Sequence, residues 1–331
     1  MRKSVILLAS IVLLTCVKGN DYSFIKEFKV STPLDMKIST SGGSISVTSH
    51  DKDIVEVAFI VKKRNQLLHI TLEELKNLVD IDITNDSNFF QISVEKSGES
   101  NISVGFEIKA PRKSSCILHT SGGSIKASDL EGAQELHTSG GSLVINNITG
   151  KLDGKTSGGS ININNTNGDL VARTSGGSIS LENINGKVDV STSGGGIDIT
   201  NSKFDVTAST SGGSIDLTDA HGQIDLNTSG GSISLKNVSG SIEGKTSGGG
   251  ISGNITKLSE KLVLKTSGGG IDVNVPSGLG MNLNLSANRV HTQLKNFSGS
   301  ADKGKIVGQV NGGGIWVELA TSGGDVTLNY K

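Results

Sequence analysis

The tetrapeptide Thr-Ser-Gly-Gly recurs along this chain at a fixed interval. Successive copies begin at Thr120, Thr138, Thr156 and so on to Thr246 without a change of period, the next copy, at Thr266, comes two residues late, and others begin at Thr40 and Thr321. A fixed period of this length is typical of a solenoid, in which each unit packs only against its neighbours. The 331 residues therefore need not form the two globular domains that their number would suggest.

Apolar residues alternate with polar ones inside each unit. One unit places Ile179, Leu181, Val188 and Val190 in its apolar positions, and neighbouring units repeat the pattern. An alternation of period two predicts short strands with one buried face. Because the period is constant, we expect each strand to pair with its copy in the next unit, parallel and in register, over about four apolar side chains per coil.

The segments rich in Gly, Ser and Asn are predicted to be corners. At the first corner, "SGG" is expected to bend the chain through the positive φ values that glycine adopts readily. The second corner carries Asn or Asp, with Gly three residues later in six of seven units and Phe204 in the other. These residue types suit turns and left-handed conformations. The corner residues are Asp129, Asn147, Asn165, Asn183, Asn201, Asp219 and Asn237.

The predicted fold class is all-β: a parallel β-solenoid with eighteen residues per coil, right-handed by analogy with most parallel crossovers. Exposed edges of such a stack need caps. Residues 20–119 are expected to hold the first coil and a β-rich cap with a strand-helix-strand insertion. Residues 120–275 form the regular repeats, and residues 276–331 the C-terminal coils and cap. Thr71 and Glu74 have capping-box spacing at the start of the one short helix.

Residues 1–19 have the features of a secretory signal peptide. A basic start precedes an apolar run that ends at Leu14, and small residues surround a cleavage site after Gly19. This segment is too short to span a bilayer, and no transmembrane segment is predicted in the mature chain. Lipidation at Cys16 is the alternative. After cleavage Cys116 is the one remaining thiol, so no intramolecular disulfide is expected.

The charges of the chain nearly balance, with 31 Lys and Arg against 32 Asp and Glu and a net charge of −1. Such a balance leaves no charge excess to neutralise phosphates, so no nucleic-acid partner is predicted. Export through the signal peptide would place the protein in the periplasm, on the outer membrane surface or outside the cell.

Three segments carry a family resemblance: "FEIKAP" from Phe106 to Pro111, the "TSGGSI" units, and "ATSGGDVTL" from Ala320 to Leu328. They resemble the putative adhesin family of exported β-strand-repeat proteins, close to those with a head-GIN domain. The resemblance covers about residues 24–331. It implies the fold above and supplies neither an established activity nor catalytic residues. The array in this chain is more regular than the family pattern.

The outward position before each repeated Thr forms a column along the stack. Acidic residues two positions earlier would form a second column beside it, and adjacent basic and acidic columns indicate a solvated surface with weak ion pairs. The alternative is a polyanion-binding stripe formed by His119, His137, Lys155 and Arg173. The first column is His119, His137, Lys155, Arg173, Ser191, Ser209, Asn227, Lys245 and Lys265, and the second includes Asp153, Asp189, Asp225 and Glu243.

No metal, cofactor or catalytic residue is predicted. His119 and His137 are expected side by side on neighbouring coils, but no third ligand is evident beside them. Calcium at the corners stays open, although "SGGSID" has Ile where calcium-binding β-rolls have a loop residue. The many serines recur as turn residues, and no Ser, His and Asp trio stands apart from the repeat.

Trp316 is the remaining candidate for binding. Ile315, Val317 and Leu319 share the buried parity, so Trp316 is expected to face outward, where an indole can stack on a sugar or a partner. The alternative is that it packs under the C-terminal cap.

These observations predict an exported, non-enzymatic β-solenoid that serves as a cell-surface adhesin or envelope scaffold. Its polar ladders would face glycans or cell-surface and matrix proteins, and the chain would be a monomer or associate weakly end to end. The alternatives are a polysaccharide-active β-helix enzyme and a passive structural spacer. An acidic pair in a groove would favour the enzyme, whereas evenly spread polar columns would favour the binder.

Overall fold

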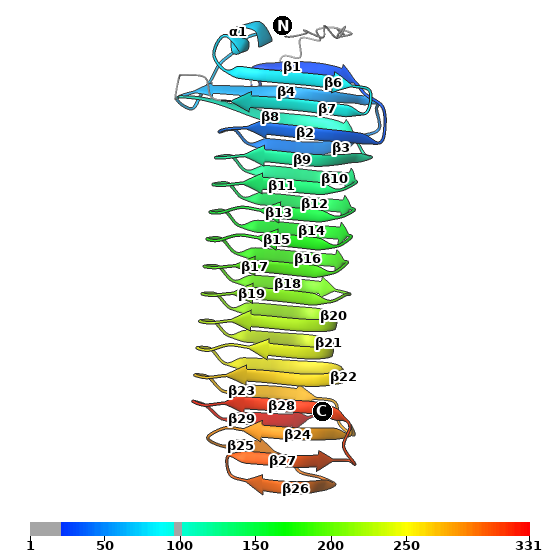
Figure 1. The fold of residues 1–331 in the computed structure, drawn as a ribbon, viewed down its shortest axis with the longest axis vertical. Coiled ribbons are helices and arrows are strands. Elements are labelled where there is room, and N and C mark those ends of the chain that lie inside the picture. Colours follow the sequence, from blue (N-terminus) through cyan, green and yellow to red (C-terminus); the bar gives the residue numbers. More distant parts are fainter. Residues whose placement is uncertain (1–20, 96–100) are drawn as a thin grey trace, which may run out of the picture. The chain divides into compact units, whose positions relative to one another are not determined.

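The computed structural model describes residues 21–95 and 101–331, so the predicted signal peptide and Cys16 lie outside the described residues. The structure is 65% strand with one short helix among the described residues (Figure 1), which confirms the predicted all-β solenoid class. None of their helices has the length and hydrophobicity that a membrane span requires. The chain divides into two compact units, residues 1–149 and 150–331. The division at 119/120 and 275/276, which follows repeat regularity, stays a prediction.

Unit 1 contains the first coil, the N-terminal cap and two regular coils. Its elements are β1 (Phe24–Lys29), β2 (Leu34–Thr40), β3 (Ile45–His50), β4 (Ile54–Lys63), β5 (Gln66–Leu67), α1 (Leu72–Lys76), β6 (Asp80–Asp86), β7 (Phe89–Glu95), β8 (Ile102–Pro111), β9 (Ser114–Thr120), β10 (Ile125–Glu131), β11 (Gln134–Thr138) and β12 (Leu143–Thr149).

Unit 2 contains the remaining coils and the C-terminal cap. Its strands are β13 (Leu152–Lys155), β14 (Ile161–Asn167), β15 (Leu170–Arg173), β16 (Ile179–Asn185), β17 (Val188–Thr192), β18 (Ile197–Ser202), β19 (Val206–Thr210), β20 (Ile215–Thr228), β21 (Ile233–Lys245), β22 (Ile251–Thr266), β23 (Ile271–Val275), β24 (Met281–Ser286), β25 (Val290–Thr292), β26 (Phe297–Asp302), β27 (Lys305–Val310), β28 (Ile315–Thr321) and β29 (Val326–Tyr330).

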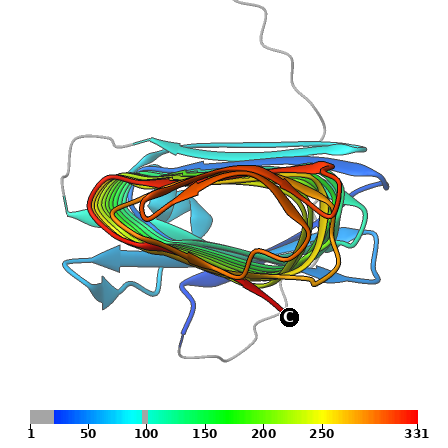
Figure 2. The ribbon, with the colours of Figure 1, turned by 90° about the horizontal axis from the view of Figure 1, so that it is seen from below.

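Strands of the regular coils pair in parallel with the copy one repeat further along the chain. Ile161 faces Ile179, and Ile179 faces Ile197, so identical positions form columns. Figure 2 shows the coils of residues 150–275 overlying one another along two long sides and two corners. The predicted in-register stacking is therefore confirmed. The two extra residues before Thr266 fall in a bulged stretch of β22.

The first coil of unit 1 stacks directly on a coil that comes much later in the sequence, because β2 pairs with β9 and aligns Thr40 with Thr120. The chain between them forms the cap. Within it, β7 and β8 run parallel to β2 and β3, whereas β4 and β6 are antiparallel to β8 and β7. Helix α1 has the predicted capping box, in which Thr71 Oγ1 accepts from the Glu74 amide and Glu74 Oε2 accepts from the Thr71 amide.

At the C-terminal end of unit 2 the chain also leaves the stack and later returns to it; this segment is called the C-terminal excursion. Strands β28 and β29 pair in parallel with β22 and β23, so Thr321 aligns with Thr266. The intervening chain lies beyond this last repeat coil: β24 pairs with the other edge of β28, and β25 pairs with β29. Strands β26 and β27 close the end as an antiparallel hairpin.

The core has a further buried column that the count of four apolar side chains per coil omitted. It lies at the second corner, where the chain turns between the two strands of a coil. Its members are Leu130 and Ile148 in unit 1 and Thr166, Ile184, Ser202, Ala220 and Val238 in unit 2. The column was missed because its polar members hide the pattern.

The prediction of positive φ values at "SGG" is wrong. Left-handed conformations occur instead at the second corner, at the Asn or Asp of each unit and at glycines such as Gly168. The second glycine of each Thr-Ser-Gly-Gly is required by close stacking: a Cβ on Gly177 would overlap the carbonyl oxygen of Gly159 in the preceding coil. The coil spacing therefore excludes any side chain at this second glycine position.

The threonine of the repeat joins successive coils through its buried hydroxyl. Thr210 Oγ1 donates to the Gly195 carbonyl oxygen of the preceding coil (2.7 Å) and accepts from the Gly213 amide of its own corner (3.3 Å). The same pair of hydrogen bonds recurs at Thr174, Thr192 and other copies. The hydroxyl thus satisfies two backbone groups that the turn leaves without strand partners.

Asparagine side chains form a second ladder at the other corner. The Asn183 amide donates to Asn165 Oδ1 (3.0 Å), and the Asn201 amide donates to Asn183 Oδ1 (2.7 Å). Each of these residues has a positive φ. Asparagine therefore supplies both the corner conformation and a bond to the next coil.

Adjacent glycines in unit 1 allow the stacking constraint to be tested. We expect Gly123→Ala to destabilise the protein by about 1–3 kcal/mol or more, because its Cβ would overlap the Gly43 backbone. Gly122→Ala is the control, since its Cβ would meet its nearest atom at 3.5 Å, and we expect a change within about 0.5 kcal/mol. Urea unfolding followed by circular dichroism measures both. Equal losses would contradict the role assigned to coil spacing.

The two hydrogen bonds of the repeat threonine, here called the threonine clamp, can be tested by removing only the hydroxyl. Thr210→Val leaves the Gly213 amide and the Gly195 carbonyl without this partner, so we expect a loss of about 1–3 kcal/mol. Thr210→Ser keeps the hydroxyl and loses one methyl group, for which about 0.8 kcal/mol is expected. The denaturation midpoints should fall in the order wild type, Ser, Val, and a valine variant as stable as the serine variant would contradict the clamp.

Candidate functional site

Two histidines lie side by side on the outer face of unit 1. His119 is the residue before the last one of β9, Thr120, and His137 is its register partner on β11. His119 Nε2 lies 3.0 Å from His137 Nδ1, and the ring centroids are 4.8 Å apart. This arrangement follows from the constant period of the repeat and confirms that the two rings are neighbours.

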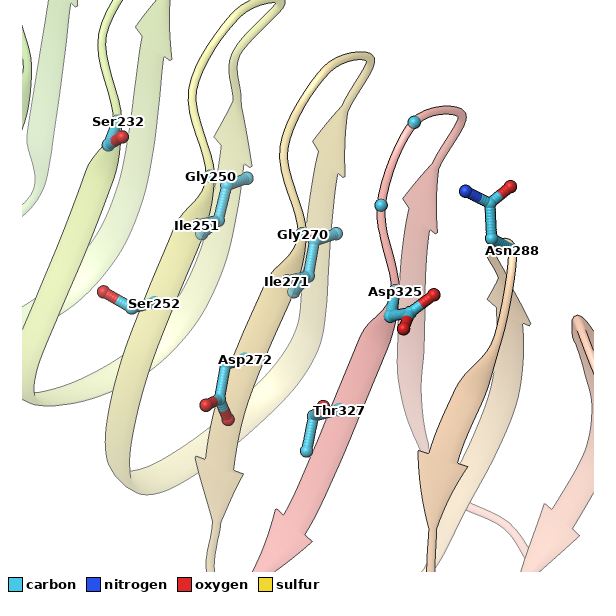
Figure 3. A pocket seen from close by; sticks show the side chains of 12 residues that line it. Ser232, Gly250, Ile251, Ser252, Gly270, Ile271, Asp272, Asn288, Asp325 and Thr327 are labelled. Carbon is cyan, nitrogen blue, oxygen red and sulfur yellow. The ribbon is translucent and has the colours of Figure 1, made fainter.

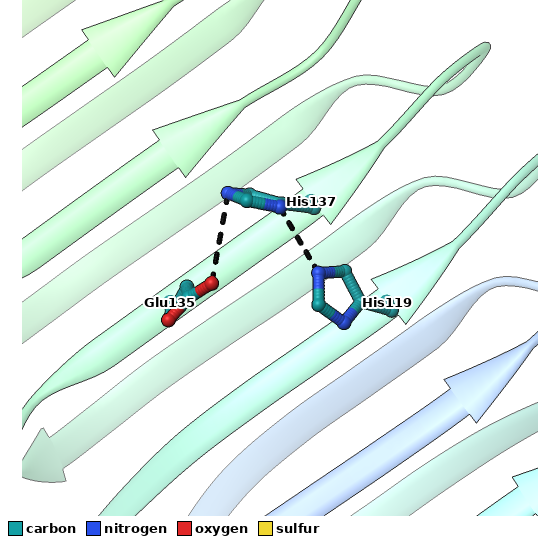
Figure 4. Close-up of side chains that lie close together, drawn as sticks. All are labelled: His119, Glu135 and His137. Atoms are coloured by element: carbon teal, nitrogen blue, oxygen red, sulfur yellow. Dashed lines mark hydrogen bonds and ion pairs between the residues drawn. The ribbon is translucent and has the colours of Figure 1, made fainter.

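A third ligand-type side chain completes this cluster, so the expectation that none lies beside the histidines is wrong. Glu135 is two residues before His137 and points to the same face, with Oε1 3.9 Å from His137 Nε2 (Figure 4). One ligand atom from each of the three residues falls within 4.8 Å of the others. The signal was available in the sequence, because residues two apart on a strand share a face.

The surroundings of His119 favour its neutral ring. Burial lowers the pKa of His119, and the neighbouring His137 lowers it further. The neutral ring is the form that binds metal ions. Lys37, on the adjacent strand β2, also lowers this pKa, whereas Glu135 raises it.

The basic residues of the expected stripe in unit 2 are paired with acids. Lys155 Nζ lies 2.8 Å from Asp153 Oδ2. Arg173 Nη2 donates to Asp189 Oδ2 (2.7 Å), and its Nη1 donates to the Asp189 carbonyl oxygen (3.0 Å). Their positive charges are thus partly neutralised, as the solvated-surface interpretation expects. Polyanion binding by these residues stays a prediction.

A denser ion-pair group lies further along the same face of unit 2. Glu243 contacts both Lys245 and Lys261, and Lys265 Nζ lies 2.8 Å from Glu318 Oε1. Hydrogen bonds from Lys245 and then Lys261 lower the pKa of Glu243 to about 2. This carboxylate stays ionised over the whole neutral and mildly acidic range.

Trp316 lies on the outer face of β28, as its parity predicts. Its side chain is 43% exposed, and its register partners are Lys261 on β22 and Asn282 on β24. This exposure argues against packing under the C-terminal cap. Whether Trp316 binds a ligand stays a prediction.

A polar groove of about 630 Å³ crosses the face of unit 2 that β22, β23 and β29 form (Figure 3). Most coils carry Ser at the position after the two glycines, but Gly250 and Gly270 replace it in two successive coils. The missing side chains leave space between Ser232 on one side and Asp325 on the other. The sequence gives little sign of this groove, because its signal is the absence of two serines.

The groove offers hydrogen-bonding groups of several kinds. Asp272 on β23 and Thr327 on β29 are register partners, and Asp325 precedes Thr327 by two residues. Ser252 and Asn288 also line the groove. Hydroxyl, amide and carboxylate groups on a concave surface can hydrogen-bond a hydroxyl-rich ligand.

Comparison with known proteins agrees with the repeat fold. Residues 205–329 match the Toastrack DUF4097 family model, so this part of unit 2 is similar to that family. The match agrees with the resemblance to a family of unknown function that the sequence motifs indicate. No curated protein matches the chain.

Three solved structures are similar over most of their length. A putative cell adhesion protein from Clostridium sporogenes is 12% identical, with 93% of this chain and 98% of that chain covered and a TM-score of 0.21. A putative adhesin from Bacteroides fragilis is 16% identical (76% and 96% covered, TM-score 0.32). A putative adhesin from Parabacteroides merdae is 15% identical (78% and 98% covered, TM-score 0.36).

The ion pairs of Glu243 give a pH-dependent prediction. A carboxylate whose pKa is lower in the folded than in the unfolded protein stabilises the folded state at pH values above the unfolded pKa of about 4.3. This stabilisation is lost as the pH falls toward the folded pKa. We therefore expect Glu243→Gln to lower the urea midpoint at pH 7 and to have little effect near pH 2. Asp225→Asn, at the register partner of Glu243, is the control. A constant effect of Glu243→Gln from pH 7 to pH 2 would contradict this assignment.

Proposed function

We propose that this protein is an exported, non-enzymatic β-solenoid that acts as a cell-surface adhesin or envelope scaffold and binds glycans through the groove of unit 2. The observation that carries the proposal is the polar concavity at Gly250 and Gly270, where two successive coils lack the serine that most coils have at this position. The similarity to the Toastrack family supports the class of protein.

The stacked coils suit a repetitive ligand. Parallel, in-register pairing places equivalent outward side chains about 4.8 Å apart along the face. Asp198 and Asp216 are such partners, and Ser234 follows them in the same column. A polymer with regularly spaced hydroxyl groups can therefore contact several equivalent side chains in succession. Matrix or cell-surface proteins are the other partners that such a surface suits.

A polysaccharide-active enzyme is the second candidate because two carboxylates line the same groove. Asp272 lies on β23, and Asp325 immediately precedes the adjacent strand β29, two residues before the register partner of Asp272. Glycoside hydrolysis commonly uses a pair of carboxyl groups, one as acid and one as base or nucleophile. Release of reducing ends from a bound glycan, abolished by Asp272→Asn or Asp325→Asn, would favour the enzyme over the binder.

Restoring the serine of the repeat tests the groove. Gly250→Ser puts back the residue that Ser232 supplies one coil earlier, so the fold should tolerate it while the groove is partly filled. On a glycan and matrix-protein array we expect the wild type to bind and Gly250→Ser to lose at least about 10-fold in affinity, roughly 1.4 kcal/mol.

Two further variants separate the surfaces. Gly196→Ser makes the same exchange in a coil that does not line the groove, and it should leave binding unchanged. Trp316→Ala tests the other candidate surface. Loss of binding in Trp316→Ala alone would indicate that the ligand binds at Trp316 on β28 and not in the groove. If the wild type binds no ligand on the array, the passive-spacer alternative is favoured.

A further inference from the structure

We infer that His119, Glu135 and His137 form a binding site for a transition-metal ion, preferentially Zn²⁺, on the outer face of unit 1. This site is separate from the proposed glycan groove and does not depend on it. The three residues are the one group of three or more ligand-type side chains found close together among residues 21–95 and 101–331.

The backbone fixes the spacing of the ligands. His119 and His137 are register partners on adjacent parallel strands, and Glu135 shares a face with His137 on β11. Two ligands of a tetrahedral Zn²⁺ at 2.0–2.1 Å from the ion lie roughly 3.3 Å apart. The two histidine nitrogens are 3.0 Å apart, so an ion between them requires a shift of only a few tenths of an ångström.

The carboxylate can reach the same ion. Its Oε1 is 3.9 Å from His137 Nε2, and the Glu135 side chain is 46% exposed, so rotation about its side-chain bonds is open to it. The three ligand atoms already lie within 4.8 Å of one another. Two histidines and one glutamate are a ligand set known from zinc sites that keep a fourth position for water.

The protonation state also suits a metal ion. The 3.0 Å contact between the two rings holds one hydrogen atom when both rings are neutral. A metal ion bound by both nitrogens takes the place of this hydrogen, so the ring that donates it must carry its hydrogen on its other nitrogen instead. His137 Nε2 has no hydrogen-bond partner among the described residues, so the hydrogen of His137 can lie there and leave Nδ1 to bind the ion.

The choice of metal follows from the donor atoms. Imidazole nitrogen suits Zn²⁺, Cu²⁺ and Ni²⁺, whereas Ca²⁺ and Mg²⁺ prefer oxygen ligands. A single carboxylate with two imidazoles therefore disfavours the alkaline-earth ions. The ion would link two successive coils near the junction between the N-terminal cap and the repeats.

Titration calorimetry of the untagged protein with ZnCl₂ at pH 7.5 tests this inference. We expect one ion per chain. His119→Ala and His137→Ala should each weaken binding by at least about 100-fold and Glu135→Gln by at least about 10-fold, since even outer-shell partners of metal ligands contribute 10- to 100-fold. CaCl₂ should give no saturable binding at this site.

His221→Ala is the matched control, because His221 is exposed and hydrogen-bonds Ser239 on the neighbouring coil of unit 2. It should bind Zn²⁺ like the wild type. Circular dichroism establishes that the variants fold, and the visible spectrum of Co²⁺ bound to the wild type reports four-coordinate nitrogen and oxygen ligation without any substitution. Failure of the wild type to bind, or unchanged binding in His119→Ala, would overturn the site.

Discussion

The hydrogen bond from the repeat threonine to a glycine carbonyl of the preceding coil, made from Thr174 through Thr246, is the interaction on which the rest of the stack depends. It runs between Thr210 and Gly195 at 2.7 Å and recurs from coil to coil. Because the same hydroxyl also accepts from its own corner, it fixes both the shape of the turn and its distance from the next one. The close approach then excludes a Cβ, which explains why a composition typical of flexible linkers here forms ordered structure.

Much of the fold could be predicted from the sequence, because period, alternation and corner residues all indicate the same coil. The two segments in which the chain leaves the stack and returns to it were harder to predict. Thr40 and Thr120 are far apart in the sequence and yet stack, as do Thr266 and Thr321 across the C-terminal excursion. Equal repeats show which coils are alike, but they do not show which coils are neighbours when the chain leaves the stack and returns.

The candidate sites were less predictable for a different reason. Glu135 is ordinary as one residue of an acidic column, and it becomes informative only beside two histidines in register. The groove at Gly250 is marked by a side chain that the repeat normally has and this coil lacks. Strand parity, by contrast, was sufficient to place Trp316 on the surface. In a regular array the chemistry is concentrated where the pattern is broken.

The C-terminal excursion changes how unit 2 can come apart. Strand β28 is held on one edge by β22 and on the other by β24, so the last repeat of the sequence is an interior rung of the ladder. A simple stack can fray from its end one coil at a time. Here the last repeat coil opens only after β24 and β25 have separated from β28 and β29, so its release is coupled to the opening of the C-terminal cap.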